Sequence, residues 1–269
     1  GPHKLTVENT KIKGCEKAFE LDYDPEGSDI KLKNVTFEDN KTDIYLSNDS
    51  STLTNAPQVE LDEGTKDTAG AITVEVAYPA EGVQITTKTT GKDYQQNLKL
   101  TGKNDGWLIG YKKDADGEYR YLTQRKDDKY FGLNTINATA TTGEGDNVTT
   151  LKPYAQLKEG TPVKLTADIL DNARVTGWKV EKIAAEGVIE VYDVVDYDHE
   201  NPETATLTMP DYDIFVTAEY KEGATVDPGT SDTDYGGDIA AGVVIGGIAA
   251  VGAYEVGTGL YRILAMDDV

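Results

Sequence analysis

Several residue types are scarce in this sequence of 269 residues, and each scarcity excludes a class of chemistry. Cys15 is the only cysteine, so an intramolecular disulfide cannot form, and we expect a partly buried, inert thiol. The two histidines are His3 and His199, and His3 lies in GPHKL, which is typical of a protease-cleavage remnant. We therefore expect a piece of a longer protein. One remaining histidine cannot supply the Ser-His-Asp or Cys-His sets of nucleophilic catalysis.

Basic residues are also few, because 26 Lys and Arg stand against 48 Asp and Glu, giving a formal net charge of −22. Nucleic-acid binding needs a basic surface that displaces phosphate counterions, so this balance argues against a nucleic-acid partner. The motifs HExxH, GxxxxGK and CxxC are absent. We expect no catalytic residues, no metal site, no cofactor and no enzymatic activity. Acidity of this size is typical of a protein exposed outside the cell.

The first fifty residues contain two copies of one pattern, 25 positions apart. Each copy reads as three short strands with a period of two. The apolar positions that coincide are Leu5 with Ile30, Val7 with Leu32, Ile12 with Phe37, Phe19 with Ile44, and Leu21 with Leu46. Asn9 coincides with Asn34, which predicts a ladder of side-chain amides. Since such a unit cannot bury its apolar face alone, the repeat favours a stacked β-solenoid over two unrelated hairpins.

Short alternating strands separated by turn residues continue to about Arg125. We interpret residues 4–125 as β-helix coils with a C-terminal cap, and a small separate β-sandwich is the alternative. Residues 126–153 are polar and poorly periodic, which predicts a loop or linker. Strands at regular spacing follow, so residues 154–222 predict a small antiparallel β-domain. The predicted fold class is all-β, with one helical segment at the end.

That end differs in composition from the rest of the chain. Residues 223–238 are a Gly, Asp, Thr and Pro tract, which predicts a linker. Residues 239–266 form the only long apolar segment, but its sixteen apolar residues before Glu255 are fewer than the roughly twenty of a membrane span. Small residues four apart, such as Gly242 and Gly246, would let another backbone approach. We expect a helix docked on a β-domain, or on a second copy through self-association.

Three parts of the chain resemble known families. Residues Leu5 to Asp49 resemble the final coils of right-handed parallel β-helices of the pectin-lyase-like class. The segments GTPVKLTA, VTGWKV and ATLTMPDYDIFVTAEYK are similar to bacterial extracellular repeats of the internalin B type. The residues that match the repeat pattern are Gly160, Val163, Leu165, Ala167, Gly177, Trp178, Met209, Pro210 and Asp213. A long insertion between Trp178 and Thr206 departs from that pattern.

The Gly- and Ala-rich tail resembles the segment that precedes S-layer homology or similar wall-anchoring modules in surface proteins of Gram-positive gut anaerobes. Together the resemblances imply an extracellular protein of the bacterial cell surface, a stalk or adhesion module. The partners implied are a host protein or glycan, or a bacterial cell-wall component. Because pectin-lyase-like folds include enzymes, a carbohydrate-active β-helix lyase or hydrolase is the alternative function.

Aromatic residues gather in one short stretch of the chain. Trp107, Tyr111, Tyr119, Tyr121 and Tyr130 fall within 24 residues, among Lys and Arg. Amphipathic aromatics are favoured at surfaces that bind protein or sugar, so these five are the candidate ligand-binding residues. Alternation in EYRYL places Tyr119 and Tyr121 on one face of a strand. The alternative is that this face is the core of the cap.

Two acidic segments offer oxygens at alternating positions, as calcium loops do. They are DADGE, residues 114–118, and DVVDYDHE, residues 193–200. Neither has the spacing of an EF-hand loop, and Asp116-Gly117 is typical of a hairpin turn. Calcium at these positions is therefore the less favoured interpretation.

Overall fold

The computed structural model describes residues 3–22, 28–48, 57–91, 94–184 and 187–222. This part of the chain is all-β, as the sequence predicts, and its only helices are two single 3-10 turns, η1 (Gln95–Asn97) and η2 (Gly145–Asn147). The described residues divide into two compact units, 3–130 with 183–189, and 131–182 with 190–222. The predicted linker 223–238 and helix 239–266 lie outside the described residues. In the described part, no helix has the length and hydropathy of a membrane span.

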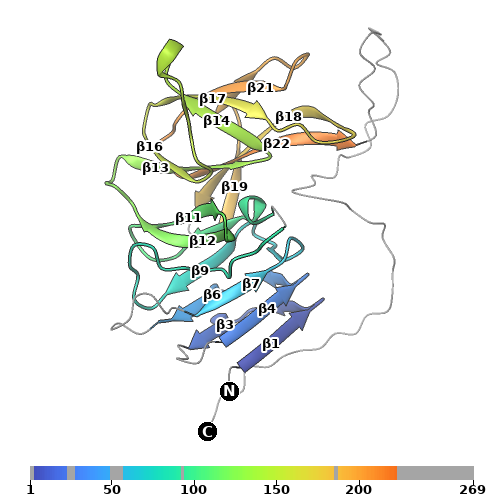
Figure 1. Ribbon diagram of the computed structural model, residues 1–269, viewed down its shortest axis with the longest axis vertical. Helices are drawn as coiled ribbons and strands as arrows, with labels where there is room; N and C mark the ends of the chain where they lie inside the picture. Colours follow the sequence, from blue (N-terminus) through green and yellow to red (C-terminus); the bar gives the residue numbers. More distant parts are fainter. Residues whose placement is uncertain (1–2, 23–27, 49–56, 92–93, 185–186, 223–269) are drawn as a thin grey trace. The chain divides into compact units, whose positions relative to one another are not determined.

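The first unit begins with three parallel sheets that the chain visits in a fixed order (Figure 1). The first sheet holds β1 (His3–Glu8), β4 (Ser28–Lys33) and β7 (Gln58–Leu61). The second holds β2 (Lys11–Lys13), β5 (Thr36–Glu38) and β8 (Lys66–Asp67). The third holds β3 (Lys17–Asp22), β6 (Thr42–Ser47), β9 (Ile72–Val76) and β10 (Leu100–Gly102). Each of the first three passes therefore adds one strand to every sheet, and β10 extends the third sheet alone.

The predicted pairing of equivalent positions is confirmed. The strand registers place Leu5 opposite Ile30, Ile12 opposite Phe37 and Phe19 opposite Ile44. In the second pass, Leu32, Phe37, Ile44 and Leu46 are all 0% exposed, because neighbouring passes cover them on both sides. Alternation along each strand thus sends the apolar residues into one shared core.

The asparagine ladder is also present. The side-chain Nδ2 of Asn34 donates to Oδ1 of Asn9 at 2.8 Å, and both residues have a φ of 50°. Asparagine tolerates this left-handed conformation better than most residues. The next rung is an aspartate, since Oδ1 of Asp62 accepts the backbone N–H of Asn34 at 2.9 Å.

The first unit ends in an antiparallel hairpin of β11 (Trp107–Asp114) and β12 (Gly117–Gln124). Residues 82–89 pair irregularly along β12 through backbone hydrogen bonds, including Ile85 N–H to Arg120 O at 2.9 Å. The same stretch bonds β7 from the other side, since Val59 N–H donates to Ile85 O at 3.1 Å. The far edge of the first sheet is therefore continued into the hairpin.

The second unit is built on two five-stranded sheets, of whose strands only Tyr130 and residues 183–189 are assigned to the first unit. One has the order β16 (Ala155–Lys158), β13 (Tyr130–Ile136), β22 (Ile214–Glu222), β18 (Ala173–Ala184) and β19 (Gly187–Val191). The other has the order β15 (Thr149–Thr150), β14 (Ala138–Thr142), β17 (Pro162–Ala167), β21 (Thr204–Thr208) and β20 (Val195–Tyr197). Its apolar cluster draws side chains from both sheets, with Val180, Ile214 and Val216 from one and Val163, Leu165 and Leu207 from the other.

The interpretation of residues 126–153 as a loop or linker is wrong. This segment contains β13 and β14, which pair with β22 and β17 inside the two sheets. Residues 132–136 of β13 are buried without alternation, so the period-two signal of a half-buried strand is missing. In β14 the buried residues are the small Ala138 and Ala140, which give a weak apolar signal. The pairing is also not wholly antiparallel, because β13 and β22 run parallel.

The residues that resemble an internalin B-type repeat lie in this unit. Val163, Leu165 and Ala167 are the buried residues of β17, and Met209 follows β21 and is buried. The indole Nε1 of Trp178 donates to the carbonyl of Pro202 at 2.8 Å. Part of the insertion after Trp178 forms β20, which pairs antiparallel with β21.

Candidate ligand-binding surface

Four of the five aromatic candidates lie on the β11–β12 hairpin, in different environments. Its connection is the two residues Ala115 and Asp116, and Oδ1 of Asp114 accepts the backbone N–H of Asp116 at 2.9 Å. Gly117 has a φ of 125°, and a Cβ there would lie 2.4 Å from the carbonyl oxygen of Thr89. Only glycine fits this position, so residues 114–118 form a hairpin turn.

The inner face of β12 carries two charged residues that are almost fully buried. Glu118 is 1% exposed and Arg120 is 0% exposed. Oε1 of Glu118 accepts the backbone N–H groups of Tyr94 and Gln95 at 2.9 and 2.7 Å. The guanidinium of Arg120 donates to three carbonyl oxygens, those of Gly110, Gln95 and Leu98, at 3.1, 3.0 and 2.8 Å. Because Gln95 begins η1, these two side chains fasten that turn to the hairpin.

Tyr111 belongs to the same buried network. Its hydroxyl donates to Oε2 of Glu118 at 2.7 Å, and its side chain is buried. Tyr111 is therefore a core residue of this end of the unit, as in the alternative interpretation of the aromatic cluster. Trp107 is half-buried and packs against the apolar core of the first unit. Both rings support the hairpin from its inner side.

Tyr119 and Tyr121 share one face of β12, as the alternation in the sequence predicts, and it is the outer face, opposite to the buried Glu118 and Arg120. Their ring centroids are 6.2 Å apart, and the ring planes are inclined by 59°. Gly110 is opposite Tyr121 on β11, and a Cβ at residue 110 would lie 2.7 Å from Cζ of that ring. The Tyr121 ring therefore lies directly on the backbone of β11. Burial raises the pKa of its hydroxyl, and the charge of Glu81 adds to the shift.

Two lysines flank the Tyr119 ring. Nζ of Lys88 lies 5.3 Å from the ring centroid and Nζ of Lys112 lies 5.8 Å away, so both are within cation–π range. Lys112 is opposite Tyr119 in the hairpin register, and Lys88 comes from the stretch that pairs with the other edge of β12. Asp114 lies 3.5 Å from Lys88, and its pKa is lowered first by the backbone N–H of Asp116 and then by Lys88. We call Tyr119, Tyr121, Lys88 and Lys112 the tyrosine patch.

Tyr130 is not part of this patch. It is the first residue of β13, and Nζ of Lys126 lies 5.1 Å from its ring centroid. Its carbonyl oxygen accepts a hydrogen bond from the guanidinium of Arg125 at 2.6 Å. Of the five aromatic candidates, the structure brings only Tyr119 and Tyr121 together on an outward face.

The acidic segments considered for calcium have structural roles. Glu118 is held inside the cap, and Oδ1 of Asp198 accepts the backbone N–H of Glu200 at 2.9 Å. The hydrogen bond from Asn201 and this backbone contact lower the pKa of Asp198. Within the residues that the structure describes, no group of three or more His, Cys, Asp or Glu side chains could hold a metal ion.

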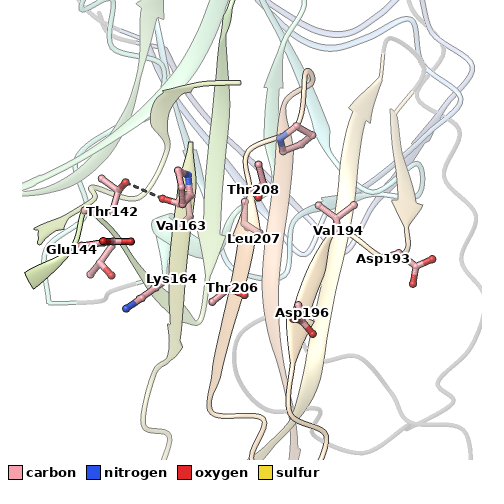
Figure 2. Close-up of a pocket in the computed structure, with 14 residues that line it drawn as sticks. Thr142, Glu144, Val163, Lys164, Asp193, Val194, Asp196, Thr206, Leu207 and Thr208 are labelled. Carbon is pink, nitrogen blue, oxygen red and sulfur yellow. Dashed lines mark hydrogen bonds between the residues drawn. The ribbon is translucent and has the colours of Figure 1, made fainter. Parts of the chain in front are cut away.

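A second surface feature, which the sequence analysis does not single out, is a groove of about 920 Å³ on the second unit (Figure 2). It runs over the outer face of β14, β17, β21 and β20, where Thr141, Lys164, Thr206 and Asp196 form one row in register. The turn at Glu144 and the residues around Asp193 contribute to its lining, and the hydroxyl of Thr142 donates to the carbonyl of Pro162 at 2.9 Å. Alternating threonines in ATATT and ATLT are the sequence signal for this polar face.

Comparisons with protein-family models, with curated proteins and with solved structures give no match. The residues and their geometry are therefore the basis of the functional argument.

Proposed function

We propose that this chain is a non-enzymatic module of a bacterial cell-surface protein, in which stacked coils act as a stalk and the tyrosine patch captures a ligand. The first unit supports the stalk, because three parallel sheets gain one strand each with each of the first three passes of the chain. Such an arrangement fits the end of a right-handed parallel β-helix of the pectin-lyase-like class, closed by the hairpin and η1 as its cap. Repeated rungs of this kind make a rigid rod whose length grows with the number of repeats.

The second unit supports the same placement at the cell surface. Its matching residues lie on β17, β18 and the turn after β21, which fits an internalin B-type extracellular repeat as a spacer. The tail would then lead towards a wall-anchoring module of the S-layer homology kind. In this proposal the protein is extracellular and its partner is a host protein or glycan, or a component of the bacterial wall.

The observation that carries the ligand-binding part is the pair of tyrosine rings on the outside of a rigid strand. Tyrosine offers a large contact area with few rotatable bonds, and its hydroxyl can exchange hydrogen bonds with a ligand. Tyr121 is held over Gly110 and Tyr119 stands between two lysines, so both rings are oriented before a ligand arrives. A preoriented ring loses less conformational entropy on binding.

Binding by the double variant Tyr119→Ala/Tyr121→Ala tests this proposal. The probes are a glycan array and a pull-down from host-cell surface proteins, each followed by a titration of the captured molecule. We expect the variant to lose at least about tenfold in affinity, since aromatic anchors dominate such interfaces. Tyr78→Ala is the matched control, because Tyr78 is a 52% exposed tyrosine of the same unit outside the patch.

Two results would count against the patch. One is equal binding by the double variant and the Tyr78→Ala control. The other is a large fall in the melting temperature of the double variant, which would make the two rings part of the core.

A further inference from the structure

The first pass of the chain leaves part of its apolar face exposed. The equivalent face of the second pass is more deeply buried. Leu5 is 48% exposed, and Val7 and Phe19 are half-buried. Their partners in the register, Leu32 for Val7 and Ile44 for Phe19, are 0% exposed. The residue types are equivalent in the two passes. Within the described residues no strand pairs with the first pass on its other side, and Ile12 and Leu21 of that pass remain buried at 8% and 2% exposure.

The backbone at this face is open in the same way. In the part of the chain that the structure describes, β1, β2 and β3 are each the terminal strand of their sheet. A terminal strand leaves alternate N–H and C=O groups directed away from the sheet, which makes it a template for a further strand. Here three such edges, one from each sheet, belong to a single pass of the chain.

Three of the ion pairs between the first two passes join equivalent positions of the repeat. Glu8 pairs with Lys33, Lys13 with Glu38, and Glu16 with Lys41, and the two members of each pair are 25 positions apart. Opposite charges therefore occupy equivalent positions in successive passes. Asn9 and Asn34 are likewise equivalent and bond each other.

We propose that the open face of the first pass is an interface that receives one further parallel coil of the same repeat. This inference deepens the proposed stalk, because it defines the chemistry of the next rung. The partner coil carries apolar residues over Leu5, Val7 and Phe19, an asparagine over Asn9, a lysine over Glu8 and a glutamate over Lys13. It continues the contact already present between the first two passes, with the same strand direction in all three sheets.

The experiment adds such a coil to the full chain. A copy of residues 30–54, which has 25 residues, is placed directly before Leu5, so that its residues equivalent to Lys33, Asn34 and Glu38 come over Glu8, Asn9 and Lys13. The matched control has the same insertion with its copies of Ile30, Leu32, Phe37, Ile44 and Leu46 changed to serine. The readouts are hydrogen exchange of the backbone amides of β1, β2 and β3, and the melting temperature of the first unit.

We expect the added coil to slow exchange of the outward amides of β1 and β3 at least about tenfold, and to raise the melting temperature by roughly 5 °C or more. The serine control should leave both values unchanged. In the unextended chain, outward amides of β1 should exchange faster than those of β4, which is paired on both sides.

Equal exchange with the added coil and with the serine control would overturn the proposal. It would also be overturned if sedimentation showed that the unextended chain forms a dimer with β1 protected, because a second copy would then be the occupant. Neither result bears on ligand capture by the tyrosine patch, so the two proposals fail separately.

Discussion

Replacing Arg120 with methionine tests how the cap of the first unit is held. The side chain is fully buried, and its guanidinium donates to the carbonyls of Gly110, Gln95 and Leu98. Methionine keeps much of the volume but leaves those carbonyls without this donor. Leaving these three buried carbonyl oxygens without the guanidinium should cost about 3 kcal/mol or more, at roughly 1–3 kcal/mol for each unsatisfied group.

Urea denaturation followed by tryptophan fluorescence measures this loss. The chain has two tryptophans, Trp107 in the first unit and Trp178 in the second, so a Trp178→Phe background reports the first unit alone. The control is Lys113→Met, which changes an exposed cation of the same hairpin and should cost less than about 1 kcal/mol. If Arg120→Met lost no more stability than the Lys113→Met control, the view that this arginine holds the cap would be refuted.

Further predictions concern single side chains of the first unit. Asn34→Ala should lower stability by about 1–2 kcal/mol in the same denaturation assay, and Asn34→Gly by less, because only the alanine is strained at a φ of 50°. Equal losses of stability in the two variants would mean that the lost side-chain amide, and not backbone strain, accounts for the effect. Burial and the charge of Asp43 raise the pKa of Asp67 to about 6, so the folded state binds that proton more tightly than the unfolded state. Stability should therefore fall as pH rises from about 4 to 6, and Asp67→Asn, which retains the oxygen that accepts the Ala69 N–H, should flatten this part of a melting-temperature profile. An unchanged profile would show that Asp67 does not titrate in this range. Tyr111→Phe should cost about 1–2 kcal/mol by removing the hydroxyl that donates to Glu118, and a neutral effect would contradict the buried network.

The strand pairing of the first two passes could be predicted, because the apolar alternation within each strand recurs at equivalent positions 25 residues later. Leu5, Ile12 and Phe19 each have an apolar counterpart at the next repeat, and the register follows from that alone. Alternation also predicted that Tyr119 and Tyr121 share one face of a strand, but not whether that face points inward or outward. Alternation in a strand assigns every second residue to one face.

The charges inside the cap could not be predicted in this way. Alternation assigns Glu118 and Arg120 to the face opposite the two tyrosines, but it does not identify that face as the buried one, because Glu and Arg are almost never fully buried unless they have partners. Their partners are mostly backbone groups of residues 94–98 and of Gly110, which no side-chain pattern marks. The strands within residues 126–153 were missed for a related reason. One is buried without alternation and the other presents only alanines to the core.

The two ends of the stacked sheets are built differently. The end beside η1 is closed by further chain segments, and the end at the first pass has exposed strand edges. At the far end, residues 85–87 pair with β7, Tyr94 donates its hydroxyl to the carbonyl of Leu61 at 2.6 Å, and buried charges fasten η1 over the core. Closing an end with buried charges requires a specific partner for each one, and a further coil would have to displace all of them. At the near end the exposed groups are Leu5, the half-buried Phe19 and strand edges, which a coil of the same pattern satisfies without displacing anything. In the proposed stalk, a further coil would therefore add at the first pass rather than at the hairpin end, and the tyrosine patch would lie at the closed end.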